Sequence, residues 1–155
     1  NSGGDGNTCG YGGGGGGGAG QVGQSFGATG TYNPGDGGNG LAIPITGSSI
    51  YYAGGGSGEG SLPYPEYMNR YAEGGLGGGG KAFPRNNPIN AGVANTGGGA
   101  AGYFQYSAYR NGGSGIVILR IPTSAYTGQT TGSPIITTVG SDTILKYTSS
   151  GTYTS

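Results

Sequence analysis

The sequence GGGGGGGAG, residues 12–20, places seven glycines in an unbroken row. Shorter runs follow at residues 54–56, 74–75, 77–80 and 97–99, and glycine supplies 43 of the 155 residues. Because glycine loses the most backbone entropy on ordering, a glycine tract is normally a flexible linker. A linker has no need of specific apolar segments between its tracts, and this sequence has them. The pattern therefore indicates a fold in which the glycines themselves are ordered.

Glycine tracts can form a fold by packing side by side as polyproline II-like helices. Such a helix has three residues per turn and no internal hydrogen bonds, so its N–H and C=O groups can pair with neighbouring helices. Only glycine permits the close approach that this pairing requires. A collagen triple helix is the rival structure, but it needs a strict Gly-X-Y period, which residues 12–18 break.

Short strands are expected between and after the glycine tracts. Residues 41–45 and 50–53 flank the turn residues 46–49, and Pro44 confines the first of these strands to a sheet edge. From Gly115 onward, isoleucine, valine and threonine replace glycine. The continuous apolar run 116–121, ended by Pro122, predicts a buried strand.

The rest of the C-terminal part predicts further strands. Residues 135–139 and 143–148 have the pattern of a hairpin around residues 140–142, and residues 152–154 are interpreted as the start of a fourth strand. No helix is expected. The predicted fold is mainly β and irregular. Packed polyglycine-II-like helices with interleaved loops and short strands occupy residues 1–114, and a small antiparallel β-module occupies residues 115–155.

Composition argues against several classes of function. The formal net charge is zero and charged residues make up 8% of the chain, so no basic surface for nucleic acid is expected. No apolar run is long enough for a membrane helix, so membrane insertion is not expected. Cys9 has no second cysteine for an intrachain disulfide. With no histidine, and with Glu59, Glu66 and Glu73 interpreted as solvated loop charges, acid–base chemistry lacks participants.

One segment imitates a phosphate-binding loop. Residues 75–81 place glycines before Lys81, but that motif requires serine or threonine next, and Ala82 stands there. We therefore expect no enzyme activity, no catalytic residue, no metal and no cofactor.

Aromatic residues are concentrated in three inserts, at residues 61–73, 83–90 and 103–111, which we interpret as loops. Tyrosine combines a large contact area with a low entropy cost, and neighbouring arginines can stack on its ring or hold anionic groups. The candidates for receptor contact are Tyr64, Tyr67, Arg70, Tyr71, Phe83, Arg85, Tyr103, Phe104, Tyr106, Tyr109 and Arg110. Contact between subunits and simple packing over the glycine segments remain alternative roles for these side chains.

The order of these segments resembles the glycine-rich domain of bacteriophage tail-fibre and related virion proteins. The resemblance rests on GGGGGGGAG (12–20), NGLAIPITGSSIYYAGGGSG (39–58), GGLGGGG (74–80), ANTGGGAAG (94–102) and GGSGIVILRIP (112–122). It implies a rigid platform of polyglycine helices at residues 12–20, 54–58, 74–80 and 97–99, with the three loops in contact with the host. Family members often have an apolar strand before the first glycine run, and none precedes it here.

Three functional hypotheses follow. The first is a structural and adhesive module at the distal tip of a phage tail fibre, on the virion and outside the cell. It would bind a bacterial surface protein or glycan and would sit in a trimer or fibre with other copies of the chain. The second is the repeating subunit of an extracellular filament assembled through β-strand or glycine-rich contacts. The third, a secreted depolymerase, is disfavoured by the absence of a credible acid–base pair.

Overall fold

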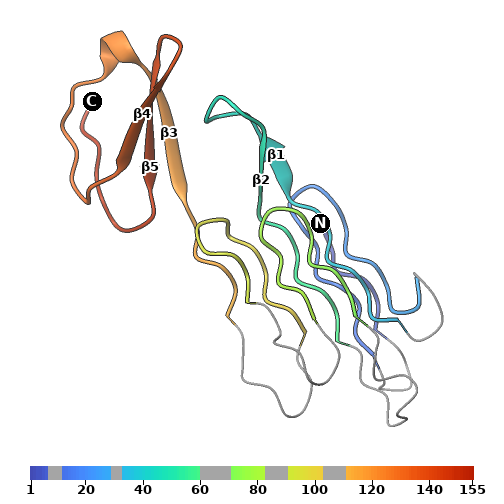
Figure 1. The fold of residues 1–155 in the computed structure, drawn as a ribbon. Helices are drawn as coiled ribbons and strands as arrows, with labels where there is room; N and C mark the ends of the chain where they lie inside the picture. The colour runs from blue at the N-terminus through green and yellow to red at the C-terminus, as the bar shows by residue number, and fades with distance from the viewer. Residues whose placement is uncertain (7–11, 29–32, 60–70, 83–90, 103–110) are drawn as a thin grey trace.

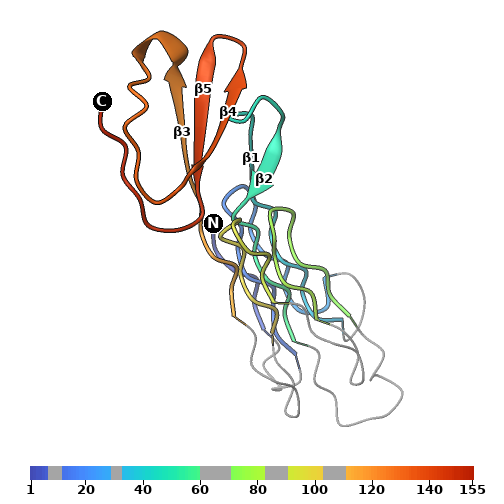
Figure 2. The same ribbon diagram turned by 60° about the vertical axis from the view of Figure 1, so that its left-hand side comes forward.

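The chain is described from a computed structural model that covers residues 1–6, 12–28, 33–59, 71–82, 91–102 and 111–155. Figures 1 and 2 show two parts: an array of extended glycine-rich segments, and a small β-sheet beyond one end of that array. The described residues contain short strands in two antiparallel sheets and no α-helix. None of them belongs to a helix long and apolar enough to cross a bilayer.

A two-stranded hairpin projects from the array toward the β-sheet (Figure 1). It consists of β1 (Leu41–Ile43) and β2 (Ile50–Tyr52), with Ala42 opposite Tyr51. The hairpin expected from the sequence is confirmed, although both strands are shorter than expected. Gly47 in the connecting turn has a φ of +92°, a conformation that side chains of L-residues rarely adopt.

The C-terminal sheet contains β3 (Val117–Pro122), β4 (Ile135–Val139) and β5 (Asp142–Tyr147). Their order is β3-β5-β4, with both pairs antiparallel. The predicted hairpin of β4 and β5 is confirmed. The prediction that the first of these strands is buried is wrong, because β3 is an edge strand paired on one side only, and Val117 is 58% exposed.

Two details of the C-terminal part also differ from the sequence-based expectations. Residues 152–154 form no fourth strand, and Tyr153 makes only an isolated bridge with Thr130. A 3₁₀ helix, η2 (Thr123–Ala125), follows β3 directly. The short return segments around this bridge lie beside the sheet instead of extending it (Figure 2).

The central strand β5 is covered on both faces. On one face, the Tyr147 hydroxyl donates a hydrogen bond to the Thr152 carbonyl at 2.8 Å. On the other face, Arg120 Nε donates to Asp142 Oδ2 at 2.8 Å, and Arg120 Nη1 reaches the carbonyl of Ile45 in the hairpin turn at 3.5 Å. Ile144 and Leu145, which point to opposite faces, are therefore both fully buried.

Main-chain hydrogen bonds connect the glycine-rich segments at intervals of three residues. The N–H groups of Gly13 and Gly16 donate to the carbonyls of Glu59 and Gly56 at 2.7 and 2.8 Å. The same three-residue step recurs between other segments, where two N–H groups three residues apart donate to two carbonyls of one neighbouring segment. These ladders are Gly35 to Gly13 with Gly38 to Gly16; Gly58 to Gly35 with Gly55 to Gly38; Gly54 to Gly77 with Ser57 to Gly80; and Gly99 to Gly54 with Gly102 to Ser57. The partners run both parallel and antiparallel.

Very little apolar side-chain area supports this array. Among the described residues of the array, the buried apolar side chains are Pro34 and three alanines, Ala72, Ala82 and Ala101. The segments approach so closely that a β-carbon added to Gly55 would lie 2.1 Å from the carbonyl oxygen of Gly16. Hydrogen bonding between glycine-rich main-chain segments therefore stabilises the array, in the way that a hydrophobic core stabilises most domains of this size.

Candidate functional site

Tyr71 is the one receptor-contact candidate within the described residues. The others lie outside them: Tyr64, Tyr67, Arg70, Phe83, Arg85, Tyr103, Phe104, Tyr106, Tyr109 and Arg110. Cys9 and Glu66 also lie outside the described residues. The structure therefore describes the glycine-rich segments that border the predicted loops, together with Tyr71 at the end of the first loop.

Tyr71 belongs to a small exposed cluster with Lys81 and Glu73. Its side chain is 58% exposed, and the Lys81 ammonium lies 5.1 Å from the centre of its ring, within range of a cation–π interaction. Lys81 also forms an ion pair with the Glu73 carboxylate. This cluster presents an aromatic face and both signs of charge to solvent.

Hydrogen bonds to the array hold the chain segments that carry this cluster. Ala72 and Ala82 form an isolated antiparallel bridge, and both side chains are buried. The Ala82 N–H donates to Ser57 Oγ at 2.8 Å, and the Glu73 N–H donates to Asp36 Oδ1 at 2.7 Å. Tyr71 and Lys81 therefore extend from a point where two chain segments are held by the neighbouring segments.

The described stretches that border the three predicted loops end on one side of the molecule. Figures 1 and 2 both place the ends of the stretches 33–59, 71–82, 91–102 and 111–155 that flank these loops at the end of the array farthest from the C-terminal sheet. Hydrogen bonds connect the stretches close to those ends, from Gly102 N–H to the Ser57 carbonyl at 2.8 Å and from Gly92 N–H to the Asn111 carbonyl at 3.0 Å. The loops thus start from neighbouring points.

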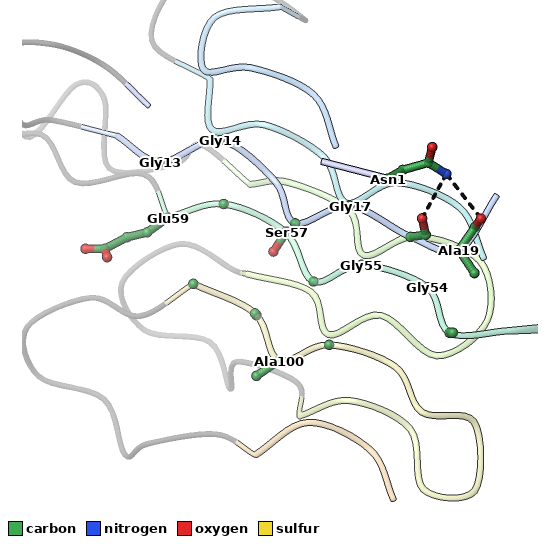
Figure 3. A pocket seen from close by; sticks show the side chains of 18 of the residues that line it. Asn1, Gly13, Gly14, Gly17, Ala19, Gly54, Gly55, Ser57, Glu59 and Ala100 are labelled. Atoms are coloured by element: carbon green, nitrogen blue, oxygen red, sulfur yellow. Dashed lines mark hydrogen bonds between the residues drawn. The ribbon is translucent and has the colours of Figure 1, made fainter. Parts of the chain in front are cut away.

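A groove of about 760 Å³ runs along three glycine-rich segments, residues 13–18, 54–59 and 97–102 (Figure 3). The Glu59 side chain lies at one end of the groove, and Asn1 and Ala19 lie at the other. Asn1 is held there because its Nδ2 donates to the carbonyls of Gly18 and Ala19 at 3.2 and 3.1 Å. Almost the whole surface of the groove is main chain.

The chemistry available in this groove is limited. Glu59 is its one ionisable side chain, and partial burial raises the pKa of that carboxyl above its usual value. No group of three or more histidine, cysteine, aspartate or glutamate side chains that could hold a metal ion occurs in the described part of the chain. The groove therefore offers hydrogen-bonding backbone and shape, and no pair of side chains placed for acid–base catalysis.

A second, apolar groove of about 340 Å³ lies where the hairpin meets the start of β3. Ile43, Ile45 and Tyr52 line it from the hairpin side, and Ile116 and Ile118 line it from the β3 side. Sequence reasoning missed both grooves and also Lys81. The position of Lys81 directly after a glycine tract and before Phe83 was the available signal for a role beside the aromatic residues.

A model of a protein family described as a glycine-rich domain matches residues 1–122. The chain belongs to this glycine-rich domain family. The match covers the glycine array, the hairpin and β3 as far as Pro122. No curated protein and no solved structure matches the chain.

Proposed function

We propose that this glycine-rich domain protein is a structural and adhesive module at the distal tip of a phage tail fibre, where it binds the surface of the host bacterium. The observation that carries the proposal is the hydrogen-bonded glycine array, with its three aromatic-rich inserts starting from one end (Figures 1 and 2). A rigid base that presents neighbouring variable loops is the usual arrangement of a recognition surface.

The rigidity of the base follows if the glycine segments are polyglycine-II-like helices. Such helices have three residues per turn, and the ladders between segments step by three residues in every pair described above. Each hydrogen bond contributes only about 1 kcal/mol net, but the ladders join many segments, so their contributions accumulate. In this arrangement the entropy cost of ordering glycine is offset by hydrogen bonding between segments of the chain instead of by apolar burial.

The aromatic loops supply the contact chemistry in this proposal. Tyr106 and Tyr109 lie in one insert and Tyr64, Tyr67 and Tyr71 in another, each with an arginine nearby in the sequence. Tyrosine rings stack on sugars and on protein surfaces, and arginine pairs with anionic groups, so the expected receptor is a surface glycan or protein. Several copies in one fibre would strengthen weak single contacts through effective concentration.

A binding assay on whole bacteria tests this function. Fluorescently labelled protein is incubated with cells of the host, and the double variant Tyr106→Ala/Tyr109→Ala is compared with the wild type. We expect the variant to lose at least about tenfold in affinity, which corresponds to about 1.4 kcal/mol. Equal binding by the two proteins would remove the 103–111 insert from the proposed receptor surface.

Tyr51→Ala is the matched control for this assay. Tyr51 is an exposed tyrosine on β2, in the hairpin at the opposite end of the array from the ends of the stretches that border the loops (Figure 1). Its substitution removes the same phenol group without altering the proposed contact end, so binding should not change. Equal losses in the control and in the loop variant would mean that the tyrosines act without regard to position.

A second candidate function is the repeating subunit of an extracellular filament. The exposed edge strand β4 favours it, because Ile135 and Ile136 are 54% and 46% exposed and the outer side of β4 has no paired strand among the described residues. Such an edge can accept a strand from another chain. A filament subunit would polymerise and would not bind cells, whereas a fibre-tip module would bind cells.

A further inference from the structure

Several residues that line the groove of Figure 3 have main-chain N–H or C=O groups without a hydrogen-bond partner among the described residues. Gly14 and Gly17 line it, and neither the N–H nor the C=O of either residue has a hydrogen-bond partner among the described residues. Gly56 and Glu59 also line it, and their N–H groups have no acceptor among the described residues. Each pair is three residues apart, which is the step of the ladders elsewhere in the array.

The unused groups stand out because their neighbours in the chain are bonded. Gly55 N–H and Gly58 N–H donate to the carbonyls of Gly38 and Gly35, both at 2.8 Å. At the far end of the same face, Ala53 N–H donates to Thr96 at 2.8 Å. Gly56 is itself buried, so its N–H lies in the array without the acceptor that a buried amide normally has.

We propose that this groove is the seat of a glycine-rich segment from a second copy of the chain, which continues the hydrogen-bonded array from one subunit into the next. This inference rests on the polyglycine-II arrangement proposed above. The groove then corresponds to a position in the array where one more helix fits. A zero net charge on each copy offers no electrostatic opposition to the contact.

The chemistry of the groove selects this kind of occupant. A sugar or an aromatic ligand would need rings to stack on, and the groove lining contains no aromatic side chain. An anion would meet the Glu59 carboxylate at the rim. A strand with bulky side chains would not come close enough to bond, because glycine Cα positions approach neighbouring carbonyls throughout the array. A bare backbone with a three-residue repeat satisfies all of these conditions.

The chain presents such a backbone on its own surface. Residues 1–6 form an outer segment of the array, in which Gly3 and Gly6 are both exposed. Neither residue has a hydrogen-bond partner for its N–H or C=O among the described residues, and the two are three residues apart. Ser2 and Asp5, in contrast, accept bonds from Gly23 and Phe26 within the same chain. The face that carries Gly3 and Gly6 is therefore the available edge.

Contact between the outer segment of one copy and the groove of another is heterologous. The two surfaces differ, so a row of subunits keeps one free groove at one end and one free segment at the other. A heterologous contact closes into a ring or continues as a fibre, according to the rotation between subunits. Both outcomes place several copies of the loop-bearing end in one assembly.

Amide hydrogen exchange, combined with sedimentation, tests the inference. The wild-type chain is examined from micromolar to millimolar concentration. We expect the mass to rise with concentration, and the amides of Gly14, Gly17, Gly56 and Glu59 to exchange at least about tenfold more slowly in the associated form. The amides of Gly55 and Gly58 should be protected at every concentration. A wild type that stays monomeric, or an assembly in which the four groove amides exchange as in the monomer, would overturn the inference.

Gly16→Leu supplies a blocking variant for the same experiment. A β-carbon at Gly16 would lie 3.5 Å from the nearest atoms of Gly56, an ordinary contact, and Gly16 is an exposed residue of the groove lining. We expect Gly16→Leu to abolish association. Gly115→Leu is the control, because Gly115 lies outside this groove and a β-carbon there meets nothing within 4 Å.

Each outcome of the variant experiment is informative. A Gly16→Leu chain that associates like the wild type contradicts the inference. If that chain fails to fold, the exchange rates of the wild type decide alone. A monomeric wild type that still binds bacteria through Tyr106 and Tyr109 refutes the groove proposal and leaves the proposed adhesive function intact.

Discussion

A methyl group at Gly56 would lie 1.7 Å from the carbonyl oxygen of Ala100. The Gly56 carbonyl accepts a hydrogen bond from Gly16, and Gly99 and Gly102 on either side of Ala100 donate to Gly54 and Ser57, so neither segment can move away cheaply. We expect Gly56→Ala to destabilise the chain by at least about 3 kcal/mol, the upper part of the range for overpacking. Thermal unfolding followed by circular dichroism measures the effect.

Gly16→Ala is the matched substitution on the neighbouring segment. Its β-carbon would make only ordinary contacts at 3.5 Å, and the residue is exposed. Alanine restricts the unfolded chain more than glycine does, so we expect no loss of stability or a gain of about 0.4–1 kcal/mol. Equal destabilisation by the two substitutions would contradict the packing of the array described above.

Glu59 gives a second prediction at this scale, through pH. Burial raises the pKa of its carboxyl in the folded state, so the folded chain binds a proton more readily than the unfolded chain. The charged Glu59 carboxylate therefore destabilises the folded state. This effect is absent at low pH, where the carboxyl is protonated in both states, and it grows as the pH rises from the unfolded pKa to the folded pKa. Glu59→Gln should raise the melting temperature at pH 7, with a difference that disappears near pH 3. A difference in melting temperature that stays constant from pH 3 to pH 7 would contradict a raised pKa for Glu59.

Among the elements, β5 holds the C-terminal sheet together because it alone is paired on both sides. Ile144 on β5 is fully buried, whereas Ile135 on the edge strand β4 is 54% exposed. We expect Ile144→Ala to cost about 2–5 kcal/mol and Ile135→Ala less than about 1 kcal/mol. Urea unfolding of the two variants measures both values, and similar losses would mean that β4 is covered in solution.

The elements that the sequence predicted correctly are those with local signals. The hairpin of β1 and β2 and the hairpin of β4 and β5 each have β-branched or aromatic runs around a glycine-containing turn. The exposure of β3 was not predictable in this way. A continuous apolar run such as residues 116–121 does not specify how many neighbours its strand has, and here it has one.

The candidate site was less accessible to sequence reasoning. Tyr71 was identified from composition, but its contact with Lys81 depends on the bridge between Ala72 and Ala82, which joins residues ten apart in sequence. The groove was not predictable at all. Its lining comes from three tracts of similar glycine-rich sequence, and nothing in a glycine run specifies which of its amides is left unpaired.

At the scale of the whole molecule, the scarcity of buried apolar side chains has a thermodynamic consequence. Unfolding exposes mostly polar backbone from the array, and polar exposure lowers the heat capacity whereas apolar exposure raises it. We expect a heat-capacity change on unfolding below the usual range of about 12–15 cal/mol/K per residue. Scanning calorimetry measures this quantity. A value within the usual range would indicate a larger apolar core than Pro34, the three alanines and β5 provide.

The proposed function gives the two ends of the molecule different roles. In that proposal the end of the array where the stretches that border the inserts terminate would face the host, and the end with the hairpin and the C-terminal sheet would face away from it (Figure 1). This polarity follows from the positions of the described stretches that border the inserts. It predicts that antibodies against the insert end block attachment to cells, while antibodies against β4 and β5 leave attachment intact.

Electron microscopy of the native source, labelled with an antibody to this chain, tests the central claim most directly. The proposed function predicts label at the distal tips of phage tail fibres. Label along continuous fibrils that are separate from any virion would contradict it and would favour the filament subunit.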